Sequence, residues 1–568
     1  MNAPTPAIVP RAAARRLPRG ALLMLCMLYV LAGFLGRDAW KSADVTALGY
    51  MAELMQGSAR WLHPTLMGLA PENPALLPYW LGAWAMQGSP GWMDPAFAVR
   101  VPYAALLALA LASTWYGTYY LARSPRAQPV AFAFGGEALP KDYARAMADG
   151  GLLAFMACLG LAQLGHETTA ALAQLGFAGL LFYALATLHY HRRTAILCAC
   201  AGACGLSLCG APTLSQLFLG GGMVIHLLDR NANAEANEQD PSKLGSAALL
   251  WVGAAASALL SWKWDLWRWK VEIPPATLAE FNGAVQLLTW FTWPAWPLAL
   301  WTVWSWRRQL FNRNISRHIA LPLWFVLVTL GSTLTTGSPD RTLLLGLPAL
   351  AALAAFALPT LKRQVAALID WFTLIFFCGC GFTIWVVWIA MQTGFPPQPA
   401  ANVARLAPGF EPHFSFFTFV VAVAATVVWT LLVKWRVGRH RAAIWKSLAL
   451  PAGGAVLCWT LLMTLWLPLL NYTQSYNALV NDTLERMQPT GCVETLGLSR
   501  SKIAAFEVYG RLELKPMQAE PQCPWLISEP LENMTAPQWV NNTLWNLQAQ
   551  MRHPADGNET ILVFRRRH

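Results

Sequence analysis

The stretch Ser415–Lys434, SFFTFVVAVAATVVWTLLVK, carries no charge before its last residue. A helix of ~20 apolar residues is about 30 Å long, which is the thickness of the hydrocarbon core of a bilayer. We therefore expect this stretch to cross a membrane. Similar blocks recur along the chain, and they predict about 13 spans, near residues 20–36, 97–122, 149–165, 168–190, 194–209, 211–228, 246–262, 284–305, 318–336, 342–360, 366–391, 415–434 and 446–468.

The composition agrees with a membrane protein. Of the 568 residues, 56% are hydrophobic and only 12% are charged, whereas soluble domains have about 25% charged residues. The formal net charge of +12 does not indicate nucleic-acid binding, because the basic residues form short clusters between apolar blocks. These clusters are Arg11, Arg15, Arg16 and Arg19, then Arg192 and Arg193, Arg307 and Arg308, Lys362 and Arg363, and the segment 434–446.

The positions of the basic clusters predict the orientation of the chain. Under the positive-inside rule, short loops rich in Lys and Arg stay in the cytoplasm. We therefore expect a cytoplasmic N-terminus, and extracytoplasmic locations for the first long loop, residues 37–96, and for the C-terminal part. The polar stretch Asn231–Lys243, with Glu235, Glu238 and Asp240, is expected to be a solvated cytoplasmic loop.

The sequence predicts two domains, a membrane domain over residues 1–469 and a small α/β domain over 470–568. The second has ordinary soluble composition and strand-like runs at Ile503–Tyr509 and Thr560–Arg565. Cys492 and Cys523 are its only cysteines. Because cysteines outside the cytoplasm are commonly oxidised, we expect them to form a disulfide. The other cysteines lie in apolar blocks, and we expect no metal site there.

The loop 37–96 is expected to begin with an amphipathic helix at the membrane surface. Val45, Leu48, Ala52 and Met55 recur at helical spacing, and Asp44 lies at the start of the helix. The carboxylate of Asp44 either stabilises the helix N-terminus or takes part in chemistry. The local sequence leaves both interpretations open.

The wider pattern of this loop resembles a known family. It consists of Asp44, Met55-Gln56-Gly57, Trp61-Leu62-His63-Pro64, Gly68-Leu69, Pro71-Glu72-Asn73-Pro74 and Pro78-Tyr79-Trp80. This pattern resembles the first periplasmic loop of the bacterial aminoarabinose transferases of lipid A, and it is more distantly similar to protein O-mannosyltransferases. The resemblance implies a C-type glycosyltransferase fold in a bacterial inner membrane.

The resemblance also implies an activity. It is the inverting transfer of a sugar from a polyprenyl-phosphate donor to lipid A, another surface glycan or a protein. The resemblance names no particular cofactor. A divalent metal bridging carboxylates and phosphate is compatible with related folds, although no ligand cluster in the sequence demands one.

The resemblance assigns roles to particular residues. Asp44 takes the place of the essential aspartate, with Asp38 as the alternative, and Glu72 takes the place of the family's glutamate. The resemblance therefore predicts catalytic roles for Asp44 and Glu72. Tyr79 is a supporting candidate. The chain departs from the family at Val45, where a glutamate is usual, and at Asn73, where a lysine is usual.

Two later segments also match the family. His166 and Glu167, in the turn between the third and fourth spans, are expected to support the reaction or bind the acceptor. The run Gly337–Arg341 with Leu347-Pro348 resembles a Gly-Lys-Leu-Pro segment. Arg341, in place of a lysine, and Lys41 are therefore expected to bind the donor phosphate.

Two other classes of function remain open. A transporter or flippase for lipid-linked intermediates would also have many spans, but it predicts charged or broken helices at mid-membrane. A non-catalytic scaffold predicts that the loop carboxylates are dispensable. The predicted spans contain few ionisable residues, which favours a reaction at the membrane surface.

Overall fold

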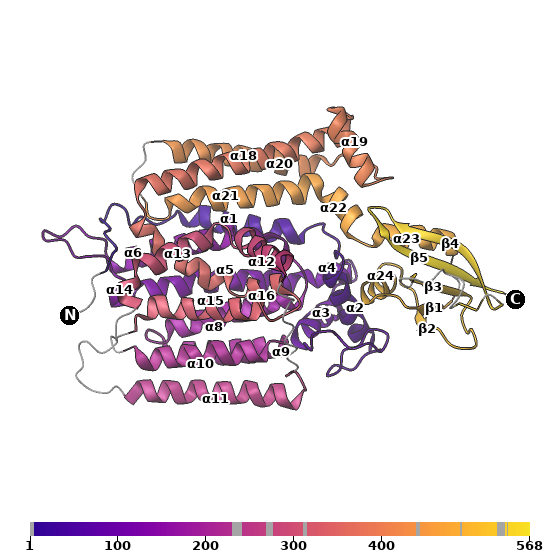
Figure 1. Cartoon of the computed structure of the whole chain (residues 1–568), viewed down its shortest axis with the longest axis horizontal. Helices are drawn as coiled ribbons and strands as arrows, with labels where there is room; N and C mark the ends of the chain where they lie inside the picture. The colour runs from indigo at the N-terminus through magenta and orange to yellow at the C-terminus, as the bar shows by residue number, and fades with distance from the viewer. Residues whose placement is uncertain are drawn as a thin grey trace.

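The computed structural model of the protein describes residues 5–229, 241–267, 277–310, 315–438, 443–488, 491–530, 540–541 and 543–567. Most of these residues belong to a bundle of roughly parallel helices, and the C-terminal domain lies at one end of it (Figure 1). We call this end the domain end and the opposite end the far end. Residues 231–240, the greater part of the predicted solvated loop, lie outside the described residues.

Every apolar block predicted from the sequence is helical. The bundle helices are α1 (Arg19–Phe34), α5 (Arg100–Ala122), α6 (Pro140–Ala157), α7 (Leu159–Leu164), α8 (Ala170–Thr187), α9 (Arg192–Leu208), α10 (Pro212–Leu228), α11 (Pro241–Lys263), α12 (Leu278–Phe291), α13 (Ala295–Ser305), α15 (Arg317–Thr333), α17 (Leu347–Ala357), α18 (Arg363–Thr393), α20 (Phe416–Val437) and α21 (Lys446–Leu461). Several blocks contain a short break in the helix, for example between α6 and α7 and between α12 and α13.

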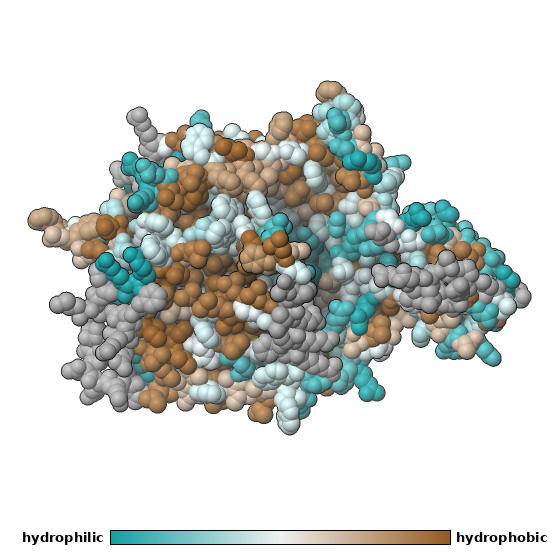
Figure 2. All heavy atoms as spheres, in the orientation of Figure 1, coloured by the Kyte–Doolittle hydropathy of each residue, from teal (hydrophilic) through white to brown (hydrophobic). Residues whose placement is uncertain are grey.

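The bundle has the surface of a multi-pass membrane protein. By length and apolar composition, six helices in the described residues can cross a membrane, and three shorter apolar helices accompany them. Hydrophobic side chains cover much of the bundle, while hydrophilic ones gather on the C-terminal domain and the far end (Figure 2). The count of about 13 spans stays a prediction.

Short elements join the bundle helices. They are η1 (Pro125–Ala127), α14 (Arg307–Leu310), α16 (Pro339–Leu344), η3 (Leu358–Thr360), α19 (Pro397–Leu406) and a π-helical turn, Leu462–Trp466.

The loop 37–96 forms a layer between the bundle and the C-terminal domain (Figure 1). It contains α2 (Ala43–Gln56), α3 (Leu77–Gln87) and α4 (Pro95–Ala98). The predicted amphipathic helix is α2. It ends at Gly57, whose φ of 78° is the left-handed conformation that glycine adopts without strain.

The C-terminal domain contains α22 (Leu467–Gln474), α23 (Asn477–Met487), α24 (Arg500–Val508), β1 (Val493–Leu496), β2 (Leu514–Pro516), β3 (Trp525–Ser528), β4 (Trp545–His553) and β5 (Asp556–Arg566). The sheet order is β2-β1-β3-β5-β4. Strand β1 pairs in parallel with β2 and β3, and β5 pairs antiparallel with β3 and β4.

One local prediction in this domain is wrong and two hold. The run Ile503–Tyr509 is not a strand, because it lies almost wholly in α24, which buries the continuous stretch 501–506. Short apolar runs are ambiguous between helix and strand. The run Thr560–Arg565 does lie in a strand, β5. The predicted disulfide between Cys492 and Cys523 is present, and it joins the segments just before β1 and β3.

The C-terminal domain packs directly on the interfacial helix α2. A Cβ atom added to Gly49 of α2 would lie 2.6 Å from Cβ of Ala504 in α24, so the two helices touch through a position without a side chain. Residues of both regions belong to one continuous hydrophobic core. The domain is therefore held against the mouth of the bundle.

Candidate functional site

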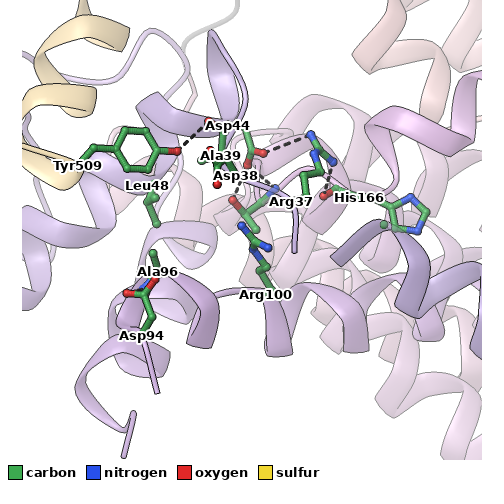
Figure 3. Close-up of a pocket in the computed structure, with 12 residues that line it drawn as sticks. Arg37, Asp38, Ala39, Asp44, Leu48, Asp94, Ala96, Arg100, His166 and Tyr509 are labelled. Atoms are coloured by element: carbon green, nitrogen blue, oxygen red, sulfur yellow. Dashed lines mark hydrogen bonds and ion pairs between the residues drawn. The ribbon is translucent and has the colours of Figure 1, made fainter. Parts of the chain in front are cut away.

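A cleft of about 470 Å³ lies at the domain end, where the bundle, the loop 37–96 and the C-terminal domain meet. Figure 3 shows the side chains converging from several elements. The cleft is lined by Gly33, Arg37, Asp38, Ala39, Asp44, Leu48, Asp94, Ala96, Arg100, His166, Thr168 and Tyr509.

Asp44 is buried in the first turn of α2, and its carboxylate accepts from four donors. Its Oδ1 accepts from the main-chain N–H of Thr168 at 2.8 Å and from the Thr168 hydroxyl at 2.5 Å. Its Oδ2 accepts from Arg37 at 3.3 Å and from the main-chain N–H of Trp40 at 3.4 Å. Oδ1 is therefore firmly anchored, whereas the two contacts of Oδ2 are long and more easily replaced.

Arg37 fixes the other side of this carboxylate. Its side chain is only 2% exposed. One terminal nitrogen contacts Asp44, and the other donates to the main-chain oxygen of His166 at 2.9 Å. The guanidinium lies 4.0 Å from the ring centroid of Trp40. A buried arginine with a carboxylate, a carbonyl and an aromatic face around it is rigidly held.

Arg100 supplies a second guanidinium to the cleft, from the start of α5. Its Nη1 donates to the main-chain oxygen of Phe34 at 2.9 Å. Asp38 lines the same cleft, and burial raises the pKa of its carboxyl group. Its own main-chain N–H donates to Asn471 of α22 at 3.1 Å, which joins this part of the cleft to the C-terminal domain.

Glu167 and Arg341 lie beside this constellation, as an ion pair of 3.1 Å. Burial, and then the negative charge of Asp44, raise the pKa of Glu167, while Arg341 opposes the shift. Because Glu167 directly precedes Thr168, the pair lies next to the anchor of Asp44. Neither Glu167 nor Arg341 is among the residues that line the cleft.

His166 is held mainly by packing. Its ring nitrogens contact the main-chain oxygens of Ala162 and Tyr29. Burial lowers the pKa of its ring to about 4, so the ring is neutral at pH 7. A Cβ atom on Gly33 would lie 2.1 Å from the ring. The contribution of His166 to polar chemistry is its main-chain oxygen, which orients Arg37.

Three further predicted site residues also lie away from the cleft lining. Glu72 is exposed and forms an ion pair of 2.9 Å with Arg500 of α24. Lys41 contacts Asp556 at 3.6 Å and Glu559 at 3.5 Å, both in β5. Tyr79 is buried.

The ring centroid of Tyr79 lies 5.2 Å from that of Tyr50. Burial raises the pKa of the Tyr79 hydroxyl. In this structure Lys41 and Glu72 therefore join the loop to the C-terminal domain, and Tyr79 packs inside the loop.

The sequence analysis missed Arg37, Arg100, Thr168 and Tyr509. Arg37 and Arg100 sit at the ends of apolar blocks, where arginine is common as an anchor at the headgroup level. Tyr509 belongs to the C-terminal domain, and its hydroxyl donates to the main-chain oxygen of Ala39 at 3.0 Å. The one signal in the sequence that could have pointed to Arg37 and Arg100 is their position, at the two ends of the loop that contains Asp38 and Asp44.

The described residues contain no group of three or more His, Cys, Asp or Glu side chains that could hold a metal ion. Asp38 and Asp44 are the carboxylates nearest the two arginines in the cleft lining.

The fold is similar to solved structures, although the sequence is distant from them. No protein-family model and no curated protein matches the sequence. ArnT from Cupriavidus metallidurans bound to undecaprenyl phosphate superposes with a TM-score of 0.59 at 14% identity, over 96% of this chain and 97% of that one. The chain has the fold of ArnT.

Two further structures are similar. The apo state of the same ArnT gives a TM-score of 0.59 at 13% identity, again over 96% and 97% of the two chains. An oligosaccharyltransferase from Archaeoglobus fulgidus gives a TM-score of 0.40 at 9% identity, over 87% of this chain and 64% of that one. The match to ArnT confirms the predicted C-type glycosyltransferase fold, with helical spans and a C-terminal domain containing a mixed sheet.

Proposed function

We propose that this protein is an inverting glycosyltransferase that moves a sugar from a polyprenyl-phosphate donor to an acceptor at the domain end of the bundle. The observation that carries the proposal is the cleft itself. It places a firmly anchored carboxylate, Asp44, beside two guanidinium groups, Arg37 and Arg100. The fold is that of ArnT, whose structure was solved with undecaprenyl phosphate bound.

The two arginines suit the leaving group. When the acceptor oxygen attacks the anomeric carbon, the bond from that carbon to the phosphate oxygen breaks, and the phosphate leaves with the electron pair. Fixed positive charge at that oxygen stabilises the charge that develops. Arg37 and Arg100 line the cleft and are the first candidates for this role. Arg341 and Lys41 stay proposed donor contacts that would need to exchange their present carboxylate partners.

Asp44 suits the acceptor side. Its Oδ2 holds two long contacts, and an acceptor hydroxyl could replace one of them and lose its proton to this oxygen. If the acceptor is instead a phosphate of lipid A, it is already an anion, and Asp44 only positions Arg37 and the donor sugar. Glu72, Asp38 and Glu167 stay proposed supporting carboxylates, of which Asp38 lines the cleft.

Comparative mass spectrometry would test the function directly. Lipid A, lipopolysaccharide and surface glycoproteins from cells with and without the protein should differ by one sugar, which names donor and acceptor together. The same purified protein, mixed with a polyprenyl-phosphate sugar and that acceptor, should release polyprenyl phosphate. Movement of the intact lipid-linked sugar across vesicles, with no transfer, would replace this proposal with a flippase.

Two arginine variants would separate the donor contacts from simple packing. Arg341→Lys keeps the charge but loses the two-pronged geometry, so it should weaken donor use less than Arg341→Ala. Arg308→Ala, an exposed arginine at the far end, is the matched control. Equal KM for donor in the two Arg341 variants and wild type would remove Arg341 from the site.

We propose that the domain end faces the periplasm of a bacterial cell and that the far end faces the cytoplasm. The basic residues Arg192, Arg307 and Arg363 begin helices at the far end, in agreement with the positive-inside rule. A reporter that is active only outside the cytoplasm should be active when fused after His568. Activity there of a reporter that works only in the cytoplasm would reverse the orientation.

A further inference from the structure

The far end of the bundle contains a second cluster of buried charge, on the opposite side of the membrane domain from the Asp44 cleft (Figure 1). It forms where α5, α8 and α10 end and where α11 and α15 begin. Its cations are Arg123, Arg126, Arg317 and Lys243, and its carboxylate in the described residues is Asp229. None of these residues has a role in the proposed transfer reaction.

Arg317 is the centre of the cluster. Its side chain is 5% exposed, and its Nε lies 4.0 Å from Oδ2 of Asp229, which is too long for a hydrogen bond. Within the described part of the chain, Nε and Nη1 of Arg317 have no hydrogen-bond partner. Buried guanidinium donors that make no hydrogen bond are costly, so these two nitrogens indicate a missing acceptor.

Arg123 and Arg126 lie close to Arg317. The Cζ atoms of Arg123 and Arg317 lie 5.1 Å and 6.0 Å from the ring centroid of Tyr190. Nη1 of Arg126 donates to the hydroxyl of Ser316, next to Arg317, at 3.3 Å. The three guanidinium groups therefore gather around one tyrosine ring and one serine.

One carboxylate, that of Asp229, lies among these cations in the described residues. Lys243 donates to the main-chain oxygen of Asp229 at 2.6 Å. His189 lies 3.8 Å from that carboxylate and contacts His226 at 3.2 Å, and neither adds a negative charge. The described residues thus place four cations around one carboxylate. Arginine at a membrane edge usually extends into water, whereas Arg317 is enclosed.

We propose that this cluster binds a phosphate group, and that the phosphate belongs to a membrane lipid. Guanidinium groups match phosphate oxygens with paired hydrogen bonds. A row of tyrosines leads from the cluster to an exposed part of α5. The ring centroids of Tyr190 and Tyr120 are 5.3 Å apart, those of Tyr120 and Tyr183 6.3 Å, and those of Tyr183 and Tyr116 6.1 Å.

Tyr116, at the end of this row, is 48% exposed. Tyrosine side chains prefer the headgroup level of a bilayer, and basic pockets between spans bind anionic headgroups. A lipid with its phosphate at Arg317 and its chains along this row would fit the surface. The site does not depend on the proposed function.

Native mass spectrometry of the purified full chain would test the site. The probes are phosphatidic acid and diacylglycerol with the same acyl chains, which differ only in the phosphate. Wild type should retain phosphatidic acid in preference to diacylglycerol. Arg317→Gln and Arg123→Gln should each weaken this retention by about tenfold or more, because a charged hydrogen-bond donor is lost. Arg363→Gln, an exposed arginine at the same end, is the matched control and should behave as wild type.

Competition by inorganic phosphate distinguishes the two sources of the group. If free phosphate displaces the lipid, and does so less well in Arg123→Gln, the pocket recognises phosphate alone. If it does not, the acyl chains contribute and the ligand is a lipid. If Arg317→Gln fails to fold, Arg123→Gln and Lys243→Gln carry the comparison.

Two results would overturn the proposal. One is equal retention of both lipids by wild type and all variants. The other concerns Glu235, Glu238 and Asp240, which lie outside the described residues. If wild type binds no phosphate probe, and replacing these three acids with Gln destabilises the protein as much as Arg317→Gln does, the chain supplies its own counter-ions.

Discussion

The two ends of the bundle bury charge in different ways. At the domain end, Arg37 contacts Asp44, and Arg100 lies near Asp38 and Asp44, so carboxylates of the same chain accompany the cations. At the far end, four cations surround the single described carboxylate of Asp229. A matched set is fixed before any ligand arrives, which suits a reaction. At the far end, two buried donors of Arg317 have no hydrogen-bond partner in the described residues, which favours an anionic ligand and suits binding.

The largest effect is expected from Asp44→Asn. This variant keeps the size of the side chain but removes its charge and its ability to take a proton. If the acceptor is a hydroxyl, the rate of sugar transfer should fall by about 100-fold to 10,000-fold. Asp142→Asn is the matched control, because Asp142 also lies in the first turn of a helix and contacts an arginine, Arg16, at 3.0 Å. It lies at the far end and should keep the wild-type rate.

The same substitution tests whether Asp44 is only a counter-ion. Losing one partner of a buried ion pair costs about 3–5 kcal/mol of unfolding free energy, because the other charge stays buried. The double variant Arg37→Met, Asp44→Asn should regain part of that stability without regaining activity. Recovery of activity in the double variant would show that neither Asp44 nor Arg37 takes part in the reaction and that the pair is structural.

A second, smaller effect is expected from breaking the disulfide. The cysteines are separated by 31 positions, and on the loop-entropy model the bond contributes about 3–4 kcal/mol to the stability of the C-terminal domain. Cys523→Ser should therefore lower the unfolding midpoint of this domain and weaken the cleft wall that Tyr509 forms. Lipid retention at the far end should not change. Ready thiol labelling of both cysteines in the unfolded, unreduced wild type would contradict the bond.

The docking of α24 on α2 should depend on pH. Burial, and then the nearby Glu53, raise the pKa of Glu507 to about 8 from 4.5, and burial also raises the pKa of Glu53. The neutral carboxyl therefore favours the docked state. Its contribution is complete below pH 4.5 and is lost as the pH rises through about 8.

Hydrogen exchange would measure this effect. Exchange of the α24 amides should accelerate, beyond the intrinsic rate, as the pH increases across this interval, and Glu507→Gln should abolish the added dependence. Glu485→Gln, an exposed glutamate of the same domain, is the control. A pH dependence that survives in Glu507→Gln would assign the effect to another group. The far-end helices should show no comparable change.

The smallest effect is expected from the exposed pair of Glu72 and Arg500. Exposed ion pairs contribute from about 0 to 1 kcal/mol, so Glu72→Gln and Arg500→Gln should change stability equally and slightly. The resemblance, which places a catalytic glutamate at Glu72, also predicts a loss of transfer rate in Glu72→Gln. A transfer rate that falls much further in Glu72→Gln than in Arg500→Gln would give Glu72 a role in the reaction beyond joining the loop to the domain.

The sequence by itself determined the helical blocks, the interfacial helix and the disulfide. Each depends on neighbouring residues or on composition. A run such as Ser415–Lys434 has to be buried or placed in lipid whatever surrounds it, and helical spacing around Asp44 defines α2 locally. The same local reasoning failed at Ile503–Tyr509, because a short apolar run fits a strand or a helix equally well. In the structure this run is helical and packs against α2.

Only the tertiary structure decided which charges meet. Asp44 contacts Thr168, 124 positions away in the chain. Tyr509 reaches Ala39 across 470 positions. Glu72 and Lys41 were assigned from the loop pattern, and their partners in the C-terminal domain were not visible in it. Arg37 and Arg317 both read as ordinary arginines beside apolar blocks. Burial makes them different, because a charge removed from water requires a partner, and that partner is chosen in space and not along the sequence.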